Sequence, residues 1–490
     1  MSRLSRRDFV RTLCASAIFL GAAGKAAARS RGRKPNIVYI LVDDMGWGDI
    51  KAYNVRSAIP TPNLDRLAQQ GMRFTDMHAP SAVCTPSRYG ILTGRYCWRS
   101  RLKSGVLYGY DPSLIEEGRL TVAGMLAKAG YYTAGVGKWH LGLGAGEKTD
   151  YSKPLTPAPT DHGFQYYFGI PASLDMAPYL YFENDRAVSL PTTETKGENE
   201  RRGVFWRPGA MAPDFTLEQV VPTLTRKAVD VIRSRAEARE QPFFLYFSLP
   251  SPHTPWLPLP EYRGKSHAGD YGDYVCETDA MVGRILDVLE QTGLSEDTLV
   301  VFTSDNGADW KESDIDSYAH RANAGWRGRK ADAWEAGHRV PFIVRWPGHV
   351  RPGTVSVELG SLADFMATTA AVLNVPLPDD AAEDSFNLLP AFEQTNHRPI
   401  RATIIDHSLE GMFTIREGNW QLILGLGSGG FTEPVRVEQK PGGPAGQLYD
   451  LASDPGQVYN LYDARPDIVR RLSALLEEYK RAGRTRPRGS

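Results

Sequence analysis

The sequence predicts an α/β fold: a doubly wound sheet flanked by helices, followed by a smaller C-terminal α+β subdomain. Largely apolar runs, typical of strands buried on both faces, alternate with helical patterns along most of the chain. After about residue 374 the character changes, and short strand-like runs alternate with turns. The longer apolar runs are residues 36–42, 132–136, 243–249, 298–303 and 342–346.

Three helical patterns lie among these runs. The first begins at Thr61-Pro62, with proline in the first turn, and ends at Gly71. A second covers about residues 274–292. The third begins at Pro466 and carries an apolar stripe on one face, as expected for a helix that packs on a small sheet.

Composition and charge exclude several classes of function. The 490 residues include 57 basic and 57 acidic side chains, and 42% are hydrophobic. This composition is typical of a folded chain. The zero formal charge argues against a nucleic-acid-binding protein and against a polybasic membrane binder, whereas an anionic substrate stays possible. No apolar run approaches the roughly 20 residues of a membrane span.

The first 28 residues are typical of an export signal. SRRDFV at residues 5–10 is a twin-arginine motif, an apolar stretch follows, and small residues at 26–28 provide a cleavage site. A chance arginine pair before an ordinary secretory signal is the alternative. In either case we expect a bacterial protein that is periplasmic or secreted, with the twin-arginine export machinery as a partner in the first case.

The chain divides into four predicted parts. Residues 1–28 form the signal, 35–373 the main α/β domain, 374–480 the C-terminal subdomain with a small sheet and a terminal helix, and 481–490 a flexible tail.

Four cysteines occur in the chain, of which Cys14 leaves with the signal. Cys97 and Cys276 could form a disulfide in an oxidising compartment or could be small buried hydrophobes, and the sequence leaves both open. The odd number of remaining cysteines indicates one with a chemical role, and Cys84 is the candidate.

Polar residues follow four of the predicted strands. In an α/β sheet the binding crevice lies beyond the carboxyl ends of the strands, so we expect these residues to meet. Three carboxylates and an amide oxygen suit Ca²⁺ or Mg²⁺ better than Zn²⁺, and a lysine with two histidines beside such a cation suits an oxyanion ester. The residues are Asp43, Asp44, Lys138, His140, His253, Asp305 and Asn306.

The most specific motif is CTPSRYGILTGR at residues 84–95. It resembles the signature of type I sulfatases in the alkaline-phosphatase-like superfamily, in the branch of arylsulfatase A and N-acetylgalactosamine-6-sulfatase. That signature is cysteine or serine, any residue, Pro-Ser-Arg, and then Leu-Thr-Gly. The resemblance covers about residues 35–479 and includes the LYDLASDP turn at 448–455. It implies an alkaline-phosphatase-like fold.

The resemblance also implies the nucleophile. Cys84 is expected to be oxidised to Cα-formylglycine by a formylglycine-generating enzyme that recognises Cys84, Pro86 and Arg88. A hydrated aldehyde carries two hydroxyls on one carbon, so that one can attack sulfur and the other can later expel sulfate. A helix that begins near Pro86 would direct its N-terminal amides at the anion. The implied reaction is hydrolysis of sulfate monoesters of aryl alcohols or of carbohydrates.

The resemblance assigns the cation side of the site. Asp43, Asp44, Asp305 and Asn306, with the modified Cys84, match the metal ligands of the family, for which Ca²⁺ is the usual ion. Asp305 is also expected to take the proton of the attacking hydroxyl.

The resemblance assigns the substrate side as well. Arg88 is expected to hold the nucleophile and the carboxylates, while Lys138 and Lys330 match the two sulfate-binding lysines. Lys330 stands in GRKADAWE at residues 328–335, where relatives often have Gly-Gly-Lys.

The two histidines match separate steps. His253 corresponds to the acid that protonates the leaving group, and His140 to the base that helps release sulfate. Asp175, His320 and His338 are weaker candidates for facing the pocket. The aperiodic segment 144–213 is expected to line the site and to determine specificity.

Two alternatives remain beside a sulfatase. One is a phosphate or phosphonate monoester hydrolase with the same fold. The other is an unmodified protein that binds sulfated glycans, which would keep Lys138 and Lys330 but would not need Cys84, His140 and His253 together.

Overall fold

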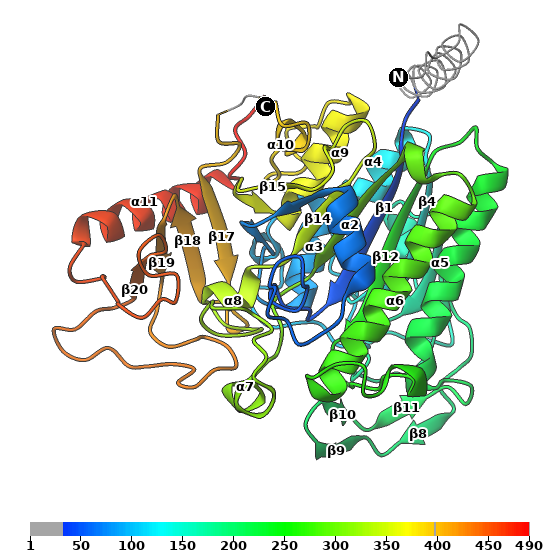
Figure 1. Ribbon diagram of the computed structural model, residues 1–490, viewed down its shortest axis with the longest axis horizontal. Coiled ribbons are helices and arrows are strands. Elements are labelled where there is room, and N and C mark those ends of the chain that lie inside the picture. The colour runs from blue at the N-terminus through cyan, green and yellow to red at the C-terminus, as the bar shows by residue number, and fades with distance from the viewer. Residues whose placement is uncertain (1–32, 396–397, 490) are drawn as a thin grey trace, which may run out of the picture.

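The computed structural model describes residues 33–395 and 398–489, so the predicted export signal lies outside the described residues. This part of the chain contains a ten-stranded sheet (Figure 1). Its strands lie in the order β15 (Thr354–Ser356), β2 (Met72–Phe74), β14 (Phe342–Arg345), β13 (Thr298–Ser304), β1 (Asn36–Asp43), β12 (Phe243–Pro252), β4 (Tyr132–Lys138), β5 (Tyr166–Ile170), β6 (Phe182–Glu183) and β7 (Arg186–Ala187).

The centre of this sheet is parallel and buried. All eight residues of β1 are buried, and Ile40 pairs with Phe247 of β12 on one side and with Phe302 of β13 on the other. β12 continues in parallel to β4, and β4 to β5. Near-continuous apolar runs form these strands because helices cover both faces of the sheet. The predicted α/β fold is confirmed.

Both edges of the sheet contain antiparallel pairs, and on one of them β6 runs antiparallel to β5 and to β7. β14 runs antiparallel to both β13 and β2, so the sheet is mixed. β2 and β15, with three residues each, and β5 inside the aperiodic segment were not predicted. Such short strands exist through their pairing with distant segments rather than through a local pattern.

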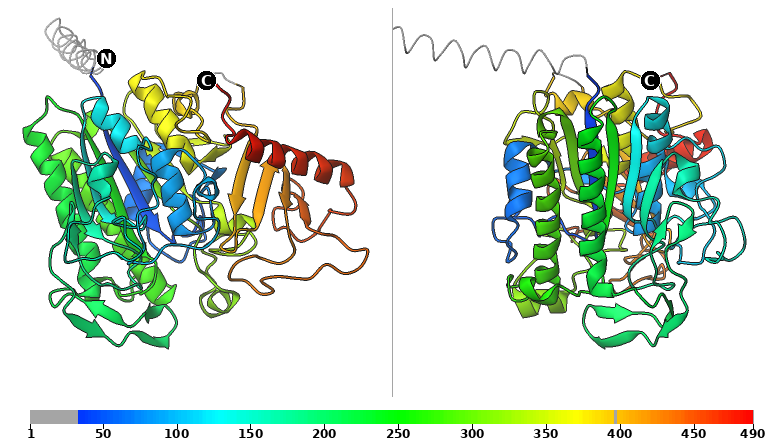
Figure 2. Two further views of the ribbon diagram at one scale, coloured as in Figure 1. Left: turned by 180° about the vertical axis from the view of Figure 1, so that it is seen from behind. Right: turned by 90° about the vertical axis from the view of Figure 1, so that its right-hand side faces the viewer.

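Helices cover both faces. α2 (Pro62–Gln70), α5 (Val220–Glu237) and α6 (Gly269–Gln291) lie in front of the sheet in Figure 1. α3 (Cys84–Thr93), α4 (Val122–Lys128) and α9 (Phe365–Leu373) contact one another on the opposite face, which Figure 2 shows from behind. Pro62 occupies the first turn of α2 as predicted, and Gly94 ends α3 in the left-handed conformation.

The C-terminal part is a four-stranded antiparallel sheet with a helix packed on it (Figure 1). Its strands are β17 (Thr403–His407), β18 (Phe413–Glu417), β19 (Trp420–Ile423) and β20 (Gln447–Asp450). The helix α11 (Pro466–Ala482) buries Leu472 and Leu476 in a small core with Ile415 and Leu422 of the sheet. The predicted α+β character is confirmed, whereas the exact domain boundaries stay a prediction.

Smaller elements surround the carboxyl ends of β1 and β12. Two antiparallel strand pairs from the aperiodic segment lie at that end of the sheet (Figure 1). They are the hairpin of β9 (Glu198–Arg201) with β10 (Val204–Trp206), and the pair of β8 (Thr193–Thr195) with β11 (Gly209–Met211) on either side of it in the chain. The remaining short elements are β3 (Met77–His78), β16 (Gly360–Ser361), α7 (Glu312–Tyr318), α8 (Glu335–His338) and α10 (Leu389–Phe392).

Two further findings bear on the sequence analysis. Cys97 and Cys276 are free, buried thiols, so the structure contains no disulfide between them. Within residues 33–395 and 398–489, no helix combines the length and the hydropathy that a bilayer span requires.

Candidate active site

Two adjacent carboxylates follow the central strand. Asp43 is the last residue of β1, and Asp44 directly after it has a left-handed backbone with φ of 66°. A non-glycine residue in this conformation carries strain that the surrounding structure must hold, and such residues gather at functional sites. Burial alone would raise the pKa of Asp43, but Lys138 and His253 among the cations beside it hold that pKa well below its usual value.

Arg88 joins these carboxylates to the end of β13. Its Nε and Nη2 donate to the same oxygen of Asp305 at 2.9 and 2.7 Å, and Nη2 lies 3.4 Å from Asp43. Its Nη1 donates to the Lys138 carbonyl and to the Ser248 hydroxyl. Arg88 is fully buried on α3, so the helix that begins at Cys84 is fixed against three strand ends.

Each lysine expected to bind sulfate contacts one of the adjacent aspartates. Lys138 at the end of β4 donates to Asp43 and, at 2.6 Å, to the Ser173 hydroxyl. Lys330 lies 2.8 Å from one oxygen of Asp44 and 2.9 Å from the other. Both ammonium groups are therefore held at the base of the site.

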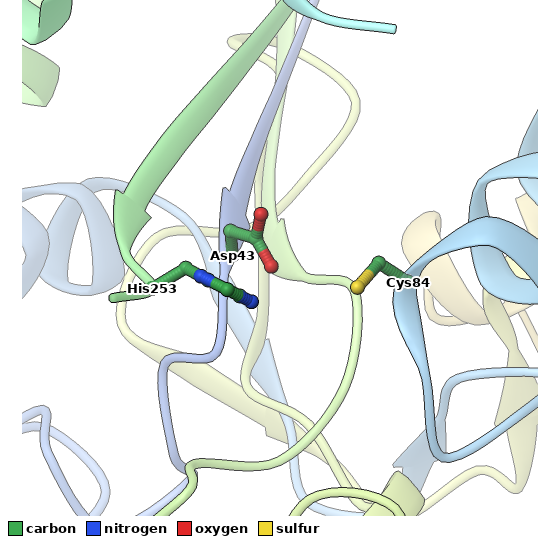
Figure 3. Close-up of side chains that lie close together, drawn as sticks. All are labelled: Asp43, Cys84 and His253. Atoms are coloured by element: carbon green, nitrogen blue, oxygen red, sulfur yellow. The ribbon is translucent and has the colours of Figure 1, made fainter. Parts of the chain in front are cut away.

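Cys84 and His253 face each other across Asp43 (Figure 3). One ligand-type atom from each of the three residues lies within 4.8 Å of the other two. They come from the start of α3, from the segment after β12, and from the end of β1. Burial is the main cause that raises the pKa of the Cys84 thiol to about 11, so the unmodified side chain is a neutral thiol.

An open cavity of about 540 Å³ leads to this group. Its lining includes Asp44, Cys84, Asp175, His253 and Lys330. The β9–β10 hairpin supplies much of one wall, as expected for the aperiodic segment. The cavity is large enough for a substrate of the size of a monosaccharide.

His253 has one ring nitrogen available. Its Nδ1 lies 2.6 Å from the Thr254 carbonyl, which only an N–H can satisfy, so the proton resides on Nδ1 in the neutral ring. Nε2 lies 3.8 Å from an oxygen of Asp44. This nitrogen can carry and release a proton at the cavity.

His140 is fully enclosed. Its Nε2 lies 2.7 Å from the Leu107 carbonyl, and its Nδ1 has no hydrogen-bond partner among the described residues. Burial, with Lys138 and Arg88 nearby, holds the pKa of His140 well below its usual value. The ring is neutral with a free acceptor at Nδ1, although His140 is not among the residues that line the cavity.

Of the three weaker candidates for facing the pocket, only Asp175 lines the cavity. Asp175 pairs with Arg207 through one oxygen. Its other oxygen lies 4.0 Å from Nδ1 of His253 and is buried without a hydrogen-bond partner among the described residues. His320 does not line the cavity, since its Nε2 lies 2.8 Å from Asp49 and its Nδ1 accepts from the Ala58 amide. His338 lies in a different cluster at the C-terminal sheet.

The oxygen atoms at the base fit a hard cation. One oxygen each from Asp43, Asp44 and Asp305 lies within 4.8 Å of the other two. Asp43 Oδ1 and Asn306 Oδ1 are buried without a hydrogen-bond partner among the described residues. Unsatisfied, closely spaced carboxylate and amide oxygens are the donor set that Ca²⁺ and Mg²⁺ prefer.

Comparison with known proteins decides the family. A family model described as sulfatase matches residues 35–375. The chain belongs to the sulfatase family. It is therefore a sulfuric ester hydrolase, as the site of carboxylates, lysines and histidines suggested.

Individual relatives match the sulfatase over most of its length. N-acetylgalactosamine-6-O-sulfatase of Bacteroides thetaiotaomicron is 36% identical, over 91% of this chain and 93% of the relative. Human arylsulfatase A is 32% identical, over 93% and 88%. A solved structure of a protein described in connection with the metabolism of multiple glycosaminoglycans by Bacteroides thetaiotaomicron superposes with a TM-score of 0.81 at 34% identity. The superposition covers 92% of this chain and 100% of that one.

Three supporting residues of the sulfatase were not predicted. Ser173 holds Lys138, Ser248 holds Arg88, and Arg207 holds Asp175. Ser248 lies within a predicted strand, and the other two lie in the aperiodic segment. Nothing in the sequence distinguishes these residues from other serines and arginines, because their partners are distant in the chain.

Proposed function

We propose that the sulfatase hydrolyses sulfate monoesters of carbohydrates through a Cα-formylglycine made from Cys84, with Ca²⁺ held by Asp43, Asp44, Asp305 and Asn306. The observation that carries this proposal is the position of Cys84. The residue begins α3 at the cavity, and the charges of Lys138 and Lys330 act on its thiol. A neutral thiol is a poor nucleophile toward a sulfate ester, so the position calls for another functional group.

The formylglycine and the cation would each supply a defined chemical function. The hydrated aldehyde supplies two hydroxyls on one carbon, and the cation supplies a Lewis acid that binds an anionic oxygen. The resemblance to the family also proposes the formylglycine-generating enzyme as a partner that recognises Cys84, Pro86 and Arg88.

The chain's own residues bind and orient the sulfate. Lys138 and Lys330 present two ammonium groups at the base of the site, where they neutralise sulfate oxygens. The first amides of α3 provide further donors for an anion. Arg88 holds Asp305 in place through two bonds, so that this carboxylate can accept a proton at its other oxygen.

Proton transfer to the leaving group falls to His253. His253 lines the cavity, its Nδ1 is held by the Thr254 carbonyl, and its Nε2 is the nitrogen left for proton transfer. A histidine can donate a proton near neutral pH, and the departing alcohol needs one. His140, neutral and with Nδ1 free, can accept a proton in the step that releases sulfate.

The surroundings favour a polar leaving group. Asp175 offers a buried oxygen that accepts no hydrogen bond from the described residues, and Arg207 and Arg202 line the same cavity. A sugar presents hydroxyls that can bond to such groups, whereas an aryl ring does not. The relatives named as acting on N-acetylgalactosamine 6-sulfate support a sulfated carbohydrate as well.

A substrate panel tests this function. Release of sulfate from N-acetylgalactosamine 6-sulfate, from other sulfated sugars and from an aryl sulfate is compared with release of phosphate from matched phosphate esters. We expect the largest kcat/KM on a sulfated sugar. Larger values on the phosphate esters would favour the phosphomonoesterase alternative, and binding without turnover by fully modified enzyme would favour a glycan-binding protein.

The export signal supports a cellular location. We propose that the enzyme works in the periplasm or outside the cell after twin-arginine export, on the basis of the SRRDFV motif at residues 5–10. Replacement of Arg6 and Arg7 by lysine should stop export. Continued export would favour the general secretory route.

A further inference from the structure

A second cluster of metal-ligating side chains lies where the main domain meets the C-terminal sheet. His78 ends β3, His338 ends α8, and Asp406 lies on β17. All three are about 1% exposed or less. One ligand-type atom from each lies within 4.8 Å of the other two. None of these residues belongs to the site described above.

The Nδ1 atoms of the two imidazoles face each other. Nδ1 of His78 lies 3.0 Å from Nδ1 of His338, and an oxygen of Asp406 lies 3.5 Å from the latter. Two nitrogens bound to one tetrahedral zinc at about 2.0–2.1 Å lie roughly 3.3 Å apart. The two separations given above are close to this value, which fits ligands of one cation.

The ring of His78 is held from behind by charged groups. Its Nε2 lies 3.0 Å from an oxygen of Asp76 and 3.3 Å from Nη1 of Arg416, so that Nδ1 is the nitrogen that faces His338. Asp76 is in turn fixed by Arg339 at 2.8 Å and by Arg416 at 2.7 Å. A carboxylate behind a histidine, itself held by other groups, is the usual support of a metal-bound imidazole.

Asp406 has no lysine or arginine partner among the described residues. Neither of its oxygens has a hydrogen-bond partner among the described residues. The two arginines whose charges act on Asp406 pair with other carboxylates, because Arg401 pairs with Asp364 and Arg416 pairs with Asp76. A buried carboxylate without a partner is costly. A hydrogen bond from His338 to His78 would satisfy the imidazoles and would still leave Asp406 unpaired.

We propose that His78, His338 and Asp406 bind a divalent transition-metal cation of the zinc class in a structural site separate from the catalytic one. Two imidazoles and one carboxylate are borderline ligands that suit zinc and its neighbours rather than Ca²⁺. The cation neutralises Asp406 and joins the C-terminal sheet to the main domain.

The site also supports the segment that leads to the nucleophile. The Ala79 amide donates to the His338 carbonyl at 2.7 Å, and the Ser81 hydroxyl and the Ala82 amide each donate to the His407 carbonyl at 3.1 Å. Residues 79–83 thus lie between the proposed metal ligands and Cys84. A metal at this point fixes the path of the chain into α3.

Metal content tests the proposal directly. The full-length enzyme is loaded with zinc in the presence of excess Ca²⁺, dialysed, and analysed for zinc per chain. Wild-type protein should hold one zinc, and Asp406→Asn should hold none. The matched control is His162→Asn, which removes a buried histidine outside the cluster and should keep the zinc. Equal zinc in Asp406→Asn and in the control would overturn the proposal.

A spectroscopic titration keeps the test valid if Asp406→Asn does not fold. Co²⁺ added to metal-free wild-type enzyme with excess Ca²⁺ should give visible absorption typical of four-coordinate cobalt, with an end point at one equivalent. Zinc should abolish this absorption. Absence of a saturable signal would show that the imidazoles share a proton instead, and would overturn the proposal.

Discussion

Arg88 and Asp305 form a buried ion pair in which two guanidinium nitrogens donate hydrogen bonds to a single carboxylate oxygen, at 2.7 and 2.9 Å. Neither side chain is exposed to solvent. The pair ties α3, which begins with the proposed nucleophile, to the end of β13, where two of the proposed cation ligands lie. The same arginine therefore positions both halves of the site.

Loss of this guanidinium should destabilise the enzyme. Arg88→Met leaves Asp305 buried without its cation, and breaking such a pair typically costs about 3–5 kcal/mol. We expect a drop of that size in the free energy of unfolding by urea. Arg95→Met, on the same segment with a side chain 15% exposed, should cost clearly less. Equal losses for the two variants would contradict the role assigned to Arg88.

Removal of a cation ligand should weaken Ca²⁺ binding and activity together. Asp44→Ala deletes an oxygen donor at the base, and Asn306→Ala deletes a second one. Both should raise the Kd for Ca²⁺ in a calorimetric titration, and chelation should abolish wild-type activity. Asp309→Asn is the control, since that carboxylate lines the cavity but pairs with Arg202 and Arg329. Unchanged Ca²⁺ affinity in Asp44→Ala would contradict the ligand assignment.

Replacement of His253 should depend on the leaving group. A sugar alcohol needs a proton to depart, whereas an activated phenolate needs little help, and general acid catalysis is typically worth about 10²–10⁴-fold. His253→Ala should lose kcat in that range on a sulfated sugar and much less on an aryl sulfate. His140→Ala should lose a similar factor on both. The reverse pattern in steady-state kinetics would exchange the two assignments.

The stability of the enzyme should respond to pH through Glu277 on α6. Burial is the main cause that raises the pKa of this side chain from 4.5 to about 7. The folded state therefore binds more protons than the unfolded state between these values, and stability contributed by Glu277 falls as pH rises from 4.5 to 7. Glu277→Gln removes this loss, so its advantage over wild type should grow across that interval toward about 3 kcal/mol.

Thermal unfolding between pH 4.5 and 8 measures this effect. Asp287→Asn, a change on the same helix at a side chain 50% exposed, should give a difference from wild type that stays flat over the interval. A flat difference for Glu277→Gln as well would show that the buried carboxyl does not titrate as stated.

Local patterns predicted the central strands and the bounded helices. β1 is a buried apolar run, α2 carries proline in its first turn, and α11 shows a continuous apolar stripe. Each of these signals depends only on residues that are close together in the sequence. β2 and β15 could not be predicted, because three residues hold no pattern and their pairing partners are far away in the chain. The antiparallel direction of β14 likewise depends on the path of the chain rather than on its residues.

The site was predictable for a different reason. Asp43, Lys138, His253 and Asp305 each follow a strand, and the geometry of a parallel sheet brings strand ends together. Ser173 and Arg207 give no such signal, since the segment that carries them has no period. The cluster of His78 and Asp406 was also not foreseen, because its members meet only through the packing of the C-terminal sheet on the main domain.

The central claim is that Cys84 acts as formylglycine, and peptide mass spectrometry of the segment around residues 84–95 tests it most directly. Enzyme made with the formylglycine-generating enzyme should show Cys84 converted to the aldehyde, and sulfate release should rise in proportion to the converted fraction across preparations. Cys84→Ala should remain folded and release no sulfate. Full activity in a preparation whose Cys84 is entirely an unmodified thiol would contradict the account.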